Sequence, residues 1–478
     1  MEKWQFYPKN HWKNGNLYLY LHWKNGNFMI KRQIYNKIAD FYKNTRKALL
    51  LSGARQVGKT YIIREFGSTF ENFIEINFID TPQAVDIFNN AKNHEDILLR
   101  LSLFTEKPLV KGKTLIFFDE VQQCPDIVTA IKFLVDEGSY RYILSGSLLG
   151  VELKDLRSEP VGYMGVMEMF PLNFREFFSA LGVSEKIFLY LRDCFEKRQP
   201  IDTPIHEQLL QLFRLYLIIG GMPAVVNRYL ETRNLRLVLD EQKDIMNLYR
   251  RDISQYAPER KKLLIKEIFN LIPSELDSKN KRFILKSLHD YAKFERYEDS
   301  FLWLTAAGVA IPTYNVDEPK LPLIMSKNRN LFKLFQNDVG LLASQYADGM
   351  QLRLLNGEEV INNGAIYENA VAQELVAHGF NLYYYNNKKR GELDFVVECN
   401  GEVLPIEVKS GKDYTLHRAL ANVMDVKEYH LREAYVLTNS NIKSEGRIVY
   451  LPIYMTMFIE NPTLPEELVY EPDLSLLK

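Results

Sequence analysis

The sequence predicts an α/β protein that begins with a parallel, doubly wound sheet and ends in a second, smaller α/β domain. Between residues 48 and 144, apolar runs of strand length alternate with stretches of helical spacing. A glycine-rich loop follows the first of these runs, and an Asn-Gly hairpin signal lies at 400–401. Because 478 residues are too many for one ordinary core, we expect about three domains.

The glycine-rich loop fits the pattern G-x-x-x-x-G-K-[ST], which receives nucleotide phosphates. It comprises Gly53, Ala54, Arg55, Gln56, Val57, Gly58, Lys59 and Thr60. An apolar run at 48–51 precedes it and helical spacing at 61–66 follows, so strand, loop and helix stand in the required order. Lys59 is expected to contact the β- and γ-phosphates, and Thr60 to ligate Mg²⁺. The alternative is a chance glycine turn, which the flanking order disfavours.

Two further strand ends carry polar residues that suit nucleotide chemistry. The run 114–118 ends in Asp119 and Glu120, the form of a Walker B element. Asp119 is predicted to hold magnesium, and Glu120 to orient or deprotonate the attacking water; the alternative is a pair of acids in the first turn of a helix. The segment Ser145-Gly146-Ser147 follows the run 140–144. Ser145, at the end of this strand, is predicted to sense the γ-phosphate; the alternative is that Ser145 or Ser147 caps the next helix. ATP and Mg²⁺ are therefore the predicted cofactors.

Composition limits the remaining classes. The formal net charge of -1 gives no overall attraction to nucleic acid, so such a role must depend on local patches. The three cysteines form no C-x-x-C pair and the eight histidines show no ligand spacing, which excludes a disulfide framework and a zinc site and favours the cytoplasm. No apolar run reaches the length of a membrane span, so no membrane role is predicted.

A second group of charged residues surrounds the Asn-Gly turn. Counting outward along the predicted hairpin places Asp394 opposite Glu407 at a non-hydrogen-bonded position, where side chains come closest. Lys409 follows two residues later on the same face as Glu407. Two facing carboxylates repel each other unless a cation lies between them. A divalent metal is the predicted cation, and the alternative is that Lys409 alone neutralises a structural acid pair.

Glu368 is the predicted third metal ligand. It lies on the apolar stripe of a helix expected from 364 to 379, so it points toward the core and requires a partner. Farther upstream, helical stretches at 261–271, 282–289 and 297–306 and an extended segment at 309–316 have the order of a winged helix. Its basic residues are either a DNA-facing surface or a solvated helix face; they are Lys279, Lys281, Arg282 and Lys286.

From residue 29 to about 454 the chain resembles a family of prokaryotic AAA-type ATPases that carry a C-terminal restriction-endonuclease-like domain of unknown function. The motifs that carry the resemblance are 53–60, 118–120, 145–147, 220–223, 249–253, 338–342 and 367–369, together with Asp394, Glu407 and Lys409. The last three residues are similar to the PD-(D/E)xK nuclease signature, with Leu393 standing where that motif has its proline.

The resemblance implies a domain order for the whole chain. The predicted segments are 1–28, disordered or preceding the natural start at Met29; 29–177, a P-loop ATPase core; 178–257, a helical lid; 258–330, a winged-helix-like domain; 331–456, a restriction-endonuclease-like domain; and 457–478, a tail.

The predicted function is a cytoplasmic ATPase that couples its nucleotide cycle to a C-terminal domain directed at nucleic acid, with DNA as the first candidate. Lys59 and Glu120 are its predicted catalytic residues, and Asp394, Glu407 and Lys409 those of a metal-dependent nuclease. The alternative is a non-nucleolytic switch whose C-terminal domain only binds nucleic acid or a protein partner. A homo-oligomer is a further candidate state, with Arg250 or Arg251 as a candidate arginine finger.

Overall fold

A computed structural model gives the arrangement of the chain. It describes residues 23–24, 27–28, 30–91, 93–146, 162–278, 281–288, 294–347, 349–358, 363–411, 413–461 and 471–472. The predictions made for residues 1–22, Ser147 and Lys279, and for most of the tail, lie outside the described residues. Ahead of the first helix, β1 (Trp23–Lys24) pairs with β2 (Asn27–Phe28) in an antiparallel ladder.

The P-loop layer is a five-stranded sheet in the order β4-β5-β6-β3-β7, with every neighbouring pair parallel. Its strands are β3 (Ala48–Ser52), β4 (Asn72–Asn77), β5 (Thr114–Asp119), β6 (Arg141–Ser145) and β7 (Met164–Glu168). Its helices are α1 (Ile34–Asn44), α2 (Lys59–Gly67), α3 (His94–Phe104) and α4 (Asp126–Glu137), with 3₁₀ turns η1 (Pro82–Ile87) and η2 (Val121–Gln123).

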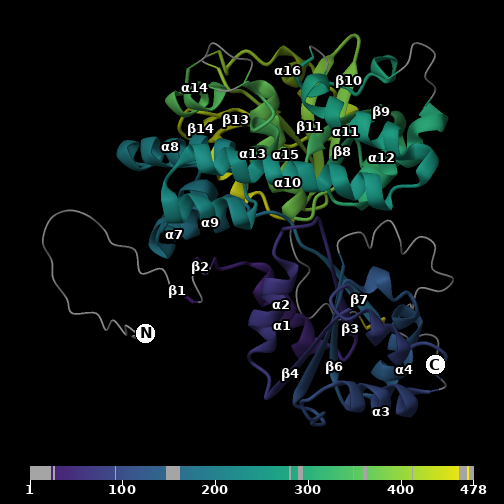
Figure 1. Ribbon diagram of the computed structural model, residues 1–478. Coiled ribbons are helices and arrows are strands. Elements are labelled where there is room, and N and C mark those ends of the chain that lie inside the picture. The colour runs from purple at the N-terminus through teal and green to yellow at the C-terminus, as the bar shows by residue number, and fades with distance from the viewer. Residues whose placement is uncertain are drawn as a thin grey trace, which may run out of the picture.

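Both faces of this sheet are covered by helices, so the doubly wound α/β prediction is confirmed (Figure 1). Alternate residues of β5 show this directly. Leu115 and Phe117 pack into one apolar cluster with α1 and α2, whereas Ile116 and Phe118 pack into another with α3 and α4. Central parallel strands are buried on both faces, which explains the unbroken apolar run from 115 to 118.

A helical region follows, which Figure 1 shows in teal above the P-loop layer. It contains α6 (Phe174–Ala180), α7 (Glu185–Lys197), α8 (Thr203–Ile219), α9 (Pro223–Thr232), α10 (Leu235–Tyr256), η4 (Glu259–Lys261), α11 (Lys262–Asp277), η5 (Leu285–Ser287) and α12 (Phe294–Ala306). Among the described residues no single helix has the length and apolarity to cross a membrane. The pair α8 and α9 passes that test together, bent by 119°.

The helix predicted at 282–289 is not formed in the part of it that the structure describes. That part contains a single 3₁₀ turn, η5. Lys281 has a positive φ of 48°, and the backbone N–H of Phe283 donates to the carbonyl of Phe332 at 3.0 Å. Attachment of this segment to a neighbouring strand competes with helix formation.

The C-terminal part is built on an eight-stranded mixed sheet in the order β14-β15-β13-β12-β11-β10-β8-β9. Its strands are β8 (Ala310–Val316), β9 (Lys327–Gln336), β10 (Tyr383–Asn387), β11 (Gly391–Cys399), β12 (Glu402–Val408), β13 (Ala434–Thr438), β14 (Lys443–Glu445) and β15 (Ile448–Pro452). The accompanying helices and turns are η6 (Leu323–Ser326), α13 (Val339–Ala343), α14 (Met350–Asn356), α15 (Gly364–Ala377), α16 (Arg418–Met424), η7 (Lys427–Tyr429) and η8 (Ile453–Phe458).

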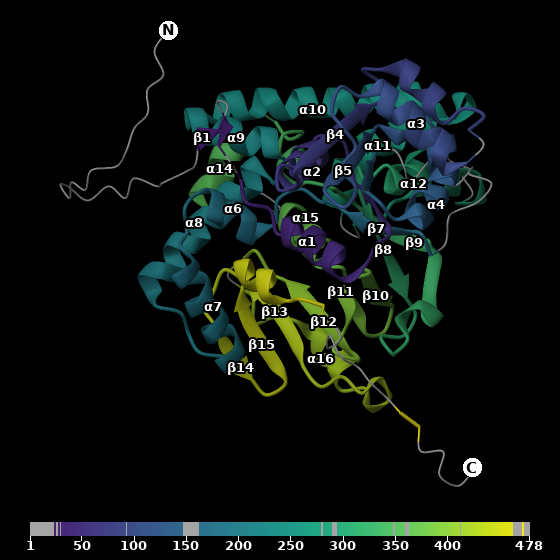
Figure 2. The same ribbon diagram turned by 90° about the horizontal axis from the view of Figure 1, so that it is seen from below.

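This sheet corrects the predicted boundary at 330/331, which falls inside β9. Strand β8 pairs with β9 in an antiparallel ladder and with β10 in a parallel one. The extended segment expected to belong to a winged helix therefore lies within the C-terminal sheet, which begins at Ala310. Figure 2 shows strands β8 to β15 from below, beside the helices.

The hairpin prediction is confirmed in turn and register. Asn400 and Gly401 both have positive φ, 54° and 73°, as the favoured two-residue turn requires. Pairing starts at Cys399 with Glu402 and continues to Phe395 with Ile406.

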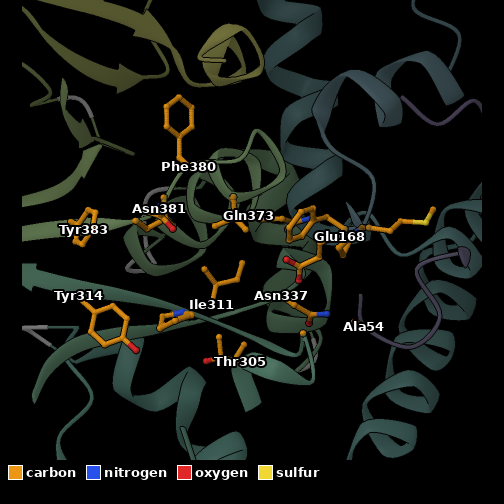
Figure 3. A pocket seen from close by; sticks show the side chains of 18 of the residues that line it. Ala54, Glu168, Thr305, Ile311, Tyr314, Asn337, Gln373, Phe380, Asn381 and Tyr383 are labelled. Carbon is orange, nitrogen blue, oxygen red and sulfur yellow. The ribbon is translucent and has the colours of Figure 1, made fainter. Parts of the chain in front are cut away.

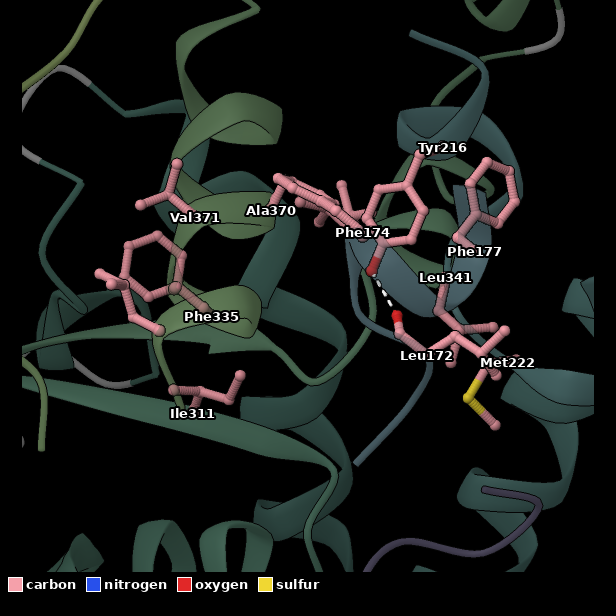
Figure 4. Close-up of a cluster of buried hydrophobic side chains, with 14 of the residues drawn as sticks. Leu172, Phe174, Phe177, Tyr216, Met222, Ile311, Phe335, Leu341, Ala370 and Val371 are labelled. Atoms are coloured by element: carbon pink, nitrogen blue, oxygen red, sulfur yellow. Dashed lines mark hydrogen bonds between the residues drawn. The ribbon is translucent and has the colours of Figure 1, made fainter. Parts of the chain in front are cut away.

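The motifs around 220–223 and 338–342 meet where the helical region joins the C-terminal sheet. The Asp338 carboxylate accepts the backbone N–H of Gly221 at 2.6 Å and that of Leu341 at 3.0 Å. Next to this contact lies a buried cluster to which all three parts of the chain contribute (Figure 4). Within it, the Tyr216 hydroxyl donates to the carbonyl of Leu172 at 2.7 Å. The parts of the chain thus share one continuous core.

Candidate ATP site and C-terminal charge centre

The P-loop connects β3 to α2 with two glycines in conformations that other residues rarely adopt. Gly53 has φ 134° and Gly58 has φ 97°. A Cβ on Gly53 would lie 2.2 Å from the carbonyl oxygen of Met169, so a side chain is excluded there by contact as well as by backbone angle. The loop ends at the N-terminus of α2, where backbone N–H groups and the helix dipole favour an anion.

Lys59 is buried and bound to its own loop. Its Nζ donates to the carbonyl oxygens of Gly53 and Ala54, each at 2.9 Å. Burial lowers the pKa of Lys59 to about 8, although the charges of Glu120 and Asp119 act to raise it. The ammonium group is therefore held where the loop closes, and its desolvated charge favours a phosphate partner.

The Asp119 carboxylate, at the end of β5, is contacted by side chains from the ends of two other strands and from one helix. Its Oδ2 accepts a hydrogen bond from Thr60 Oγ1 at 3.0 Å and from Asn77 Nδ2 at 3.3 Å. Its Oδ1 accepts a hydrogen bond from the Ser145 hydroxyl. Sequence reasoning missed Asn77, although it ends β4 in the same way that Ser145 ends β6. Hydroxyl and carboxylate oxygens are the ligands that Mg²⁺ prefers, so Thr60 and Asp119 fit this ion.

Glu120 follows Asp119 with a left-handed backbone, φ 55° and ψ 46°. The Nε2 of Gln122 donates to its carboxylate. Non-glycine residues in this region carry strain of roughly 1–3 kcal/mol and cluster at functional sites. This conformation turns Glu120 toward the cavity beside the P-loop, whose wall it forms together with Lys59.

That cavity has a volume of ≈ 490 Å³ and lies between the P-loop and α9. Its lining comprises Ile30, Arg32, Arg55, Gln56, Gly58, Lys59, Thr60, Tyr61, Asp119, Glu120, Met169, Pro223, Ala224 and Asn227. Arg32, which no sequence motif marks, donates to the carbonyl of Val57 at 2.9 Å and pairs with the buried Glu176 at 3.0 Å. It therefore ties the loop to the start of the helical region.

A second cavity of ≈ 270 Å³ lies behind the P-loop, between Ala54 and the C-terminal sheet (Figure 3). Gly308 closes one wall so tightly that a Cβ there would lie 2.9 Å from the backbone nitrogen of Ala54. Asn337 and Gln373 line the same cavity. The back of the P-loop is thus in direct contact with the C-terminal part of the chain.

Side chains from α10 hold the loop from the same direction. Asp252 Oδ1 accepts from Arg55 Nη1 at 2.6 Å, and the Tyr249 hydroxyl donates to the carbonyl of Arg55 at 3.1 Å. Asn337 Nδ2 then donates to the Tyr249 oxygen at 3.3 Å. Arg250, a candidate arginine finger, contacts Asn270 at 3.0 Å in its own chain. The motif 249–253 therefore links the P-loop to the end of β9.

The second predicted group comes together at the C-terminal sheet. Glu407 pairs with Lys409 at 2.7 Å, and Asp394 Oδ2 accepts the backbone N–H of Val408 at 2.9 Å. Burial, followed by the charge of Asp394, raises the pKa of Glu407 to about 8. Glu368 is buried as predicted, and burial followed by the charge of Asp394 raises its pKa as well.

Two lysines at this centre were missed. Lys333, on β9 and fully buried, lies 2.8 Å from Glu392, 3.6 Å from Glu368 and 3.9 Å from Asp394. Lys281 pairs with the other oxygen of Glu368. Burial alone lowers the pKa of Lys333, but the three carboxylates raise it above its ordinary value. Within the described ranges, no group of three His, Cys, Asp or Glu side chains is arranged to hold a metal ion.

Residues 45–178 match the family described as an AAA domain. This segment contains the P-loop, both acids and Ser145, in the geometry described above. The chain therefore carries an AAA-type ATPase domain. Beyond it, residues 210–351 match a domain of unknown function (DUF8612), and residues 363–455 match another (DUF4143). The restriction-endonuclease-like identity of the C-terminal part thus stays a prediction.

Among solved structures, the chain is similar to the Walker-type ATPase PABY2304 of Pyrococcus abyssi at 14% identity, covering 66% of this chain and 96% of that one, with a TM-score of 0.43. It is also similar to the Aeropyrum pernix Orc1 protein in complex with DNA, at 14% identity, 67% and 92% coverage and a TM-score of 0.25. A third is domain III of the Thermotoga maritima replication initiation protein DnaA, at 12% identity, 49% and 92% coverage and a TM-score of 0.25. None of the curated protein sequences matches the chain.

Proposed function

We propose that the AAA-type domain binds ATP with Mg²⁺ in the ≈ 490 Å³ cavity between the P-loop and α9, and hydrolyses it. The observation that carries this proposal is the convergence of a buried lysine, a hydroxyl and two acids at one wall of the cavity. These residues are Lys59, Thr60, Asp119 and Glu120. A chance glycine turn would not bring together the start of α2 and the end of β5 with these groups.

Each residue has a defined role in the proposal. Lys59 exchanges its two carbonyl partners for the β- and γ-phosphates, and Thr60 and Asp119 hold the magnesium. Bound magnesium would neutralise charge on the phosphates. Glu120 orients the attacking water and accepts its proton, while Gln122 fixes the Glu120 carboxylate.

Ser145 acts through Asp119 in this scheme. Its hydroxyl and the Asn77 amide hold the two oxygens of that carboxylate, so the orientation of the magnesium ligand depends on both. The predicted response of Ser145 to the γ-phosphate would then pass along this contact. Gly53 and Gly58 leave the backbone N–H groups of the intervening loop open to phosphate oxygens.

The test is nucleotide titration and phosphate release with the full chain. Lys59→Ala is expected to abolish detectable ATP binding, with the exposed Lys47→Ala as the matched control. Glu120→Gln is expected to keep binding and to lose turnover by about 100-fold or more, as removal of a general base usually does. Equal turnover in wild type and Glu120→Gln would remove Glu120 from the catalytic role.

We further propose that the C-terminal domain binds nucleic acid under control of the nucleotide state, and that it does so without cleaving it. The position of Lys333 among the carboxylates supports the non-nucleolytic alternative. The basic side chains of Arg282 and Lys286, which follow Lys281 in the chain, support nucleic acid as the ligand. The helical lid, the restriction-endonuclease-like fold, a homo-oligomer and a cytoplasmic location belong to the same proposal.

Incubation with linear, circular and single-stranded DNA and with RNA, with and without ATP and magnesium, tests this second proposal. We expect retention of one of these ligands that changes with ATP, and intact substrate throughout. Cleavage of any substrate by the wild type that is abolished in Asp394→Asn would instead support the predicted nuclease activity. Lack of retention of every ligand would leave a protein partner as the target of the switch.

A further inference from the structure

A lysine side chain lies beside two of the three predicted metal ligands, Glu368 and Asp394. Lys333 has no exposed surface, and its Nζ lies within 4 Å of carboxylates from two elements of the C-terminal part. Glu392 and Asp394 come from β11, and Glu368 comes from α15. The third predicted metal ligand, Glu407, pairs with Lys409.

The remaining charges of the centre are also paired within the protein. Lys281 contacts Oε1 of Glu368, whereas Lys333 lies nearest to Oε2, and Lys409 contacts Glu407 at 2.7 Å. Three ammonium groups therefore face four carboxylates. A metal entering here would have to displace the fully buried Lys333 ammonium from its carboxylates, on the face of β9 that also carries the buried side chain of Phe335. Leaving a buried charge without its partners is strongly unfavourable.

The expected metal therefore does not fit these residues. We infer that the C-terminal centre is a metal-independent ion-pair network in which Lys333 takes the place of a divalent cation and joins β9 to β11 and α15. This inference deepens the proposed non-nucleolytic function, because it gives the centre a structural role in holding the domain together. It does not depend on the ATPase proposal.

The first experiment counts Mn²⁺ ions bound to the full chain from the loss of the free-ion signal in electron paramagnetic resonance, at constant ionic strength. We expect the count in the absence of nucleotide to be the same in wild type and Asp394→Asn. A Mn²⁺ ion that binds without nucleotide and is lost in Asp394→Asn would overturn the inference. Failure of ATP binding would show separately, as the absence of any additional Mn²⁺ when a non-hydrolysable ATP analogue is added.

The second experiment removes the Lys333 ammonium group. Lys333→Met keeps most of the side-chain volume but leaves the carboxylates facing one another, so Mn²⁺ should bind at least tenfold more tightly than to wild type and should raise the melting temperature. Lys327→Met, on the same strand but over the Tyr314 ring at 3.6 Å, is the matched control and should show neither effect. A Lys333→Met protein that melts like wild type and gains no Mn²⁺ affinity would also overturn the inference. If Lys333→Met does not fold, the Mn²⁺ counts of wild type and Asp394→Asn still test the inference.

Discussion

Glu374→Gln should make the protein more stable, by an amount that grows with pH. Glu374 on α15 is fully buried, and its Oε2 accepts the backbone N–H of Phe174 at 2.9 Å. Its Oε1 lies 3.5 Å from His378 Nε2, while His378 Nδ1 lies 2.8 Å from the carbonyl of Ile459. That carbonyl can only accept, so we assign the imidazole proton to Nδ1. Nε2 is then free to accept a hydrogen bond from a protonated Glu374, and a glutamine amide can donate in the same place.

The magnitude follows from the pKa. Burial raises the pKa of Glu374 from its ordinary 4.5 to about 8, and burial lowers that of His378. Between pH 4.5 and about pH 8, Glu374 has lost its proton in the unfolded chain and has kept it in the folded chain. The free energy of unfolding of the wild type therefore falls as pH rises. At about 1.4 kcal/mol for each tenfold change in proton affinity, the penalty is on the order of 3 kcal/mol at pH 7 and 5 kcal/mol at pH 8 and above. Glu374→Gln carries no such penalty at any pH.

Thermal melts of the full chain from pH 5 to pH 9 provide the assay. The variant and wild type should melt within about 3 °C of each other at pH 5, and the variant should melt roughly 10 °C or more higher at pH 8, since about 1 kcal/mol moves a domain of this class by roughly 2–4 °C. Glu207→Gln, at an exposed site on α8, is the control and should show no difference that depends on pH. Parallel pH profiles for wild type and Glu374→Gln would refute the reasoning.

Three further outcomes are expected. Tyr249→Phe should destabilise the protein by about 1 kcal/mol and weaken ATP binding, because it removes the hydroxyl between Asn337 and the Arg55 carbonyl; calorimetry and nucleotide titration measure both. Gly220→Ala should cost about 2 kcal/mol or more in a denaturant melt, since φ is 73° and the new Cβ would lie 2.1 Å from the Asp338 carboxylate. Removal of residues 1–28 should leave the melting temperature and phosphate release unchanged, and a clearly lower melting temperature would show that this segment packs on the core.

Local patterns explain what the sequence could predict. The P-loop and the 400–401 turn each depend on backbone requirements that neighbouring residues satisfy, so strand, loop and register could be inferred without knowing the rest of the fold. Glu368 could be recognised as buried because a carboxylate on an apolar helical stripe points inward.

The missed features depend on contacts between distant segments. Asp252 forms an ion pair with Arg55, which lies 197 positions earlier in the sequence, and no local sequence pattern predicts such a pair. The burial of Lys333 could have been predicted, because alternation along β9 places its side chain on the same face as the buried Phe335. Its partners lie on β11 and α15, however, and only the fold shows which carboxylates it pairs with. The start of the C-terminal sheet was misplaced for the same reason, since β8 finds its partner β10 beyond α15.

Strand β9 sets a limit on how this protein can be recombined. Lys281 and Lys333 lie before residue 351, in the segment that matches one domain family, whereas their acidic partners lie after residue 363, in the segment that matches the next. A chimera that exchanged the chain after residue 363 for that of a distant relative would receive buried acids without a guarantee of the lysines that neutralise them. Four residues after Lys333, one residue past the end of β9, Asn337 makes the hydrogen bond to Tyr249 that supports the P-loop. The two sites are therefore expected to be inherited as a pair, and a workable exchange would have to begin ahead of Lys281 and include everything that follows.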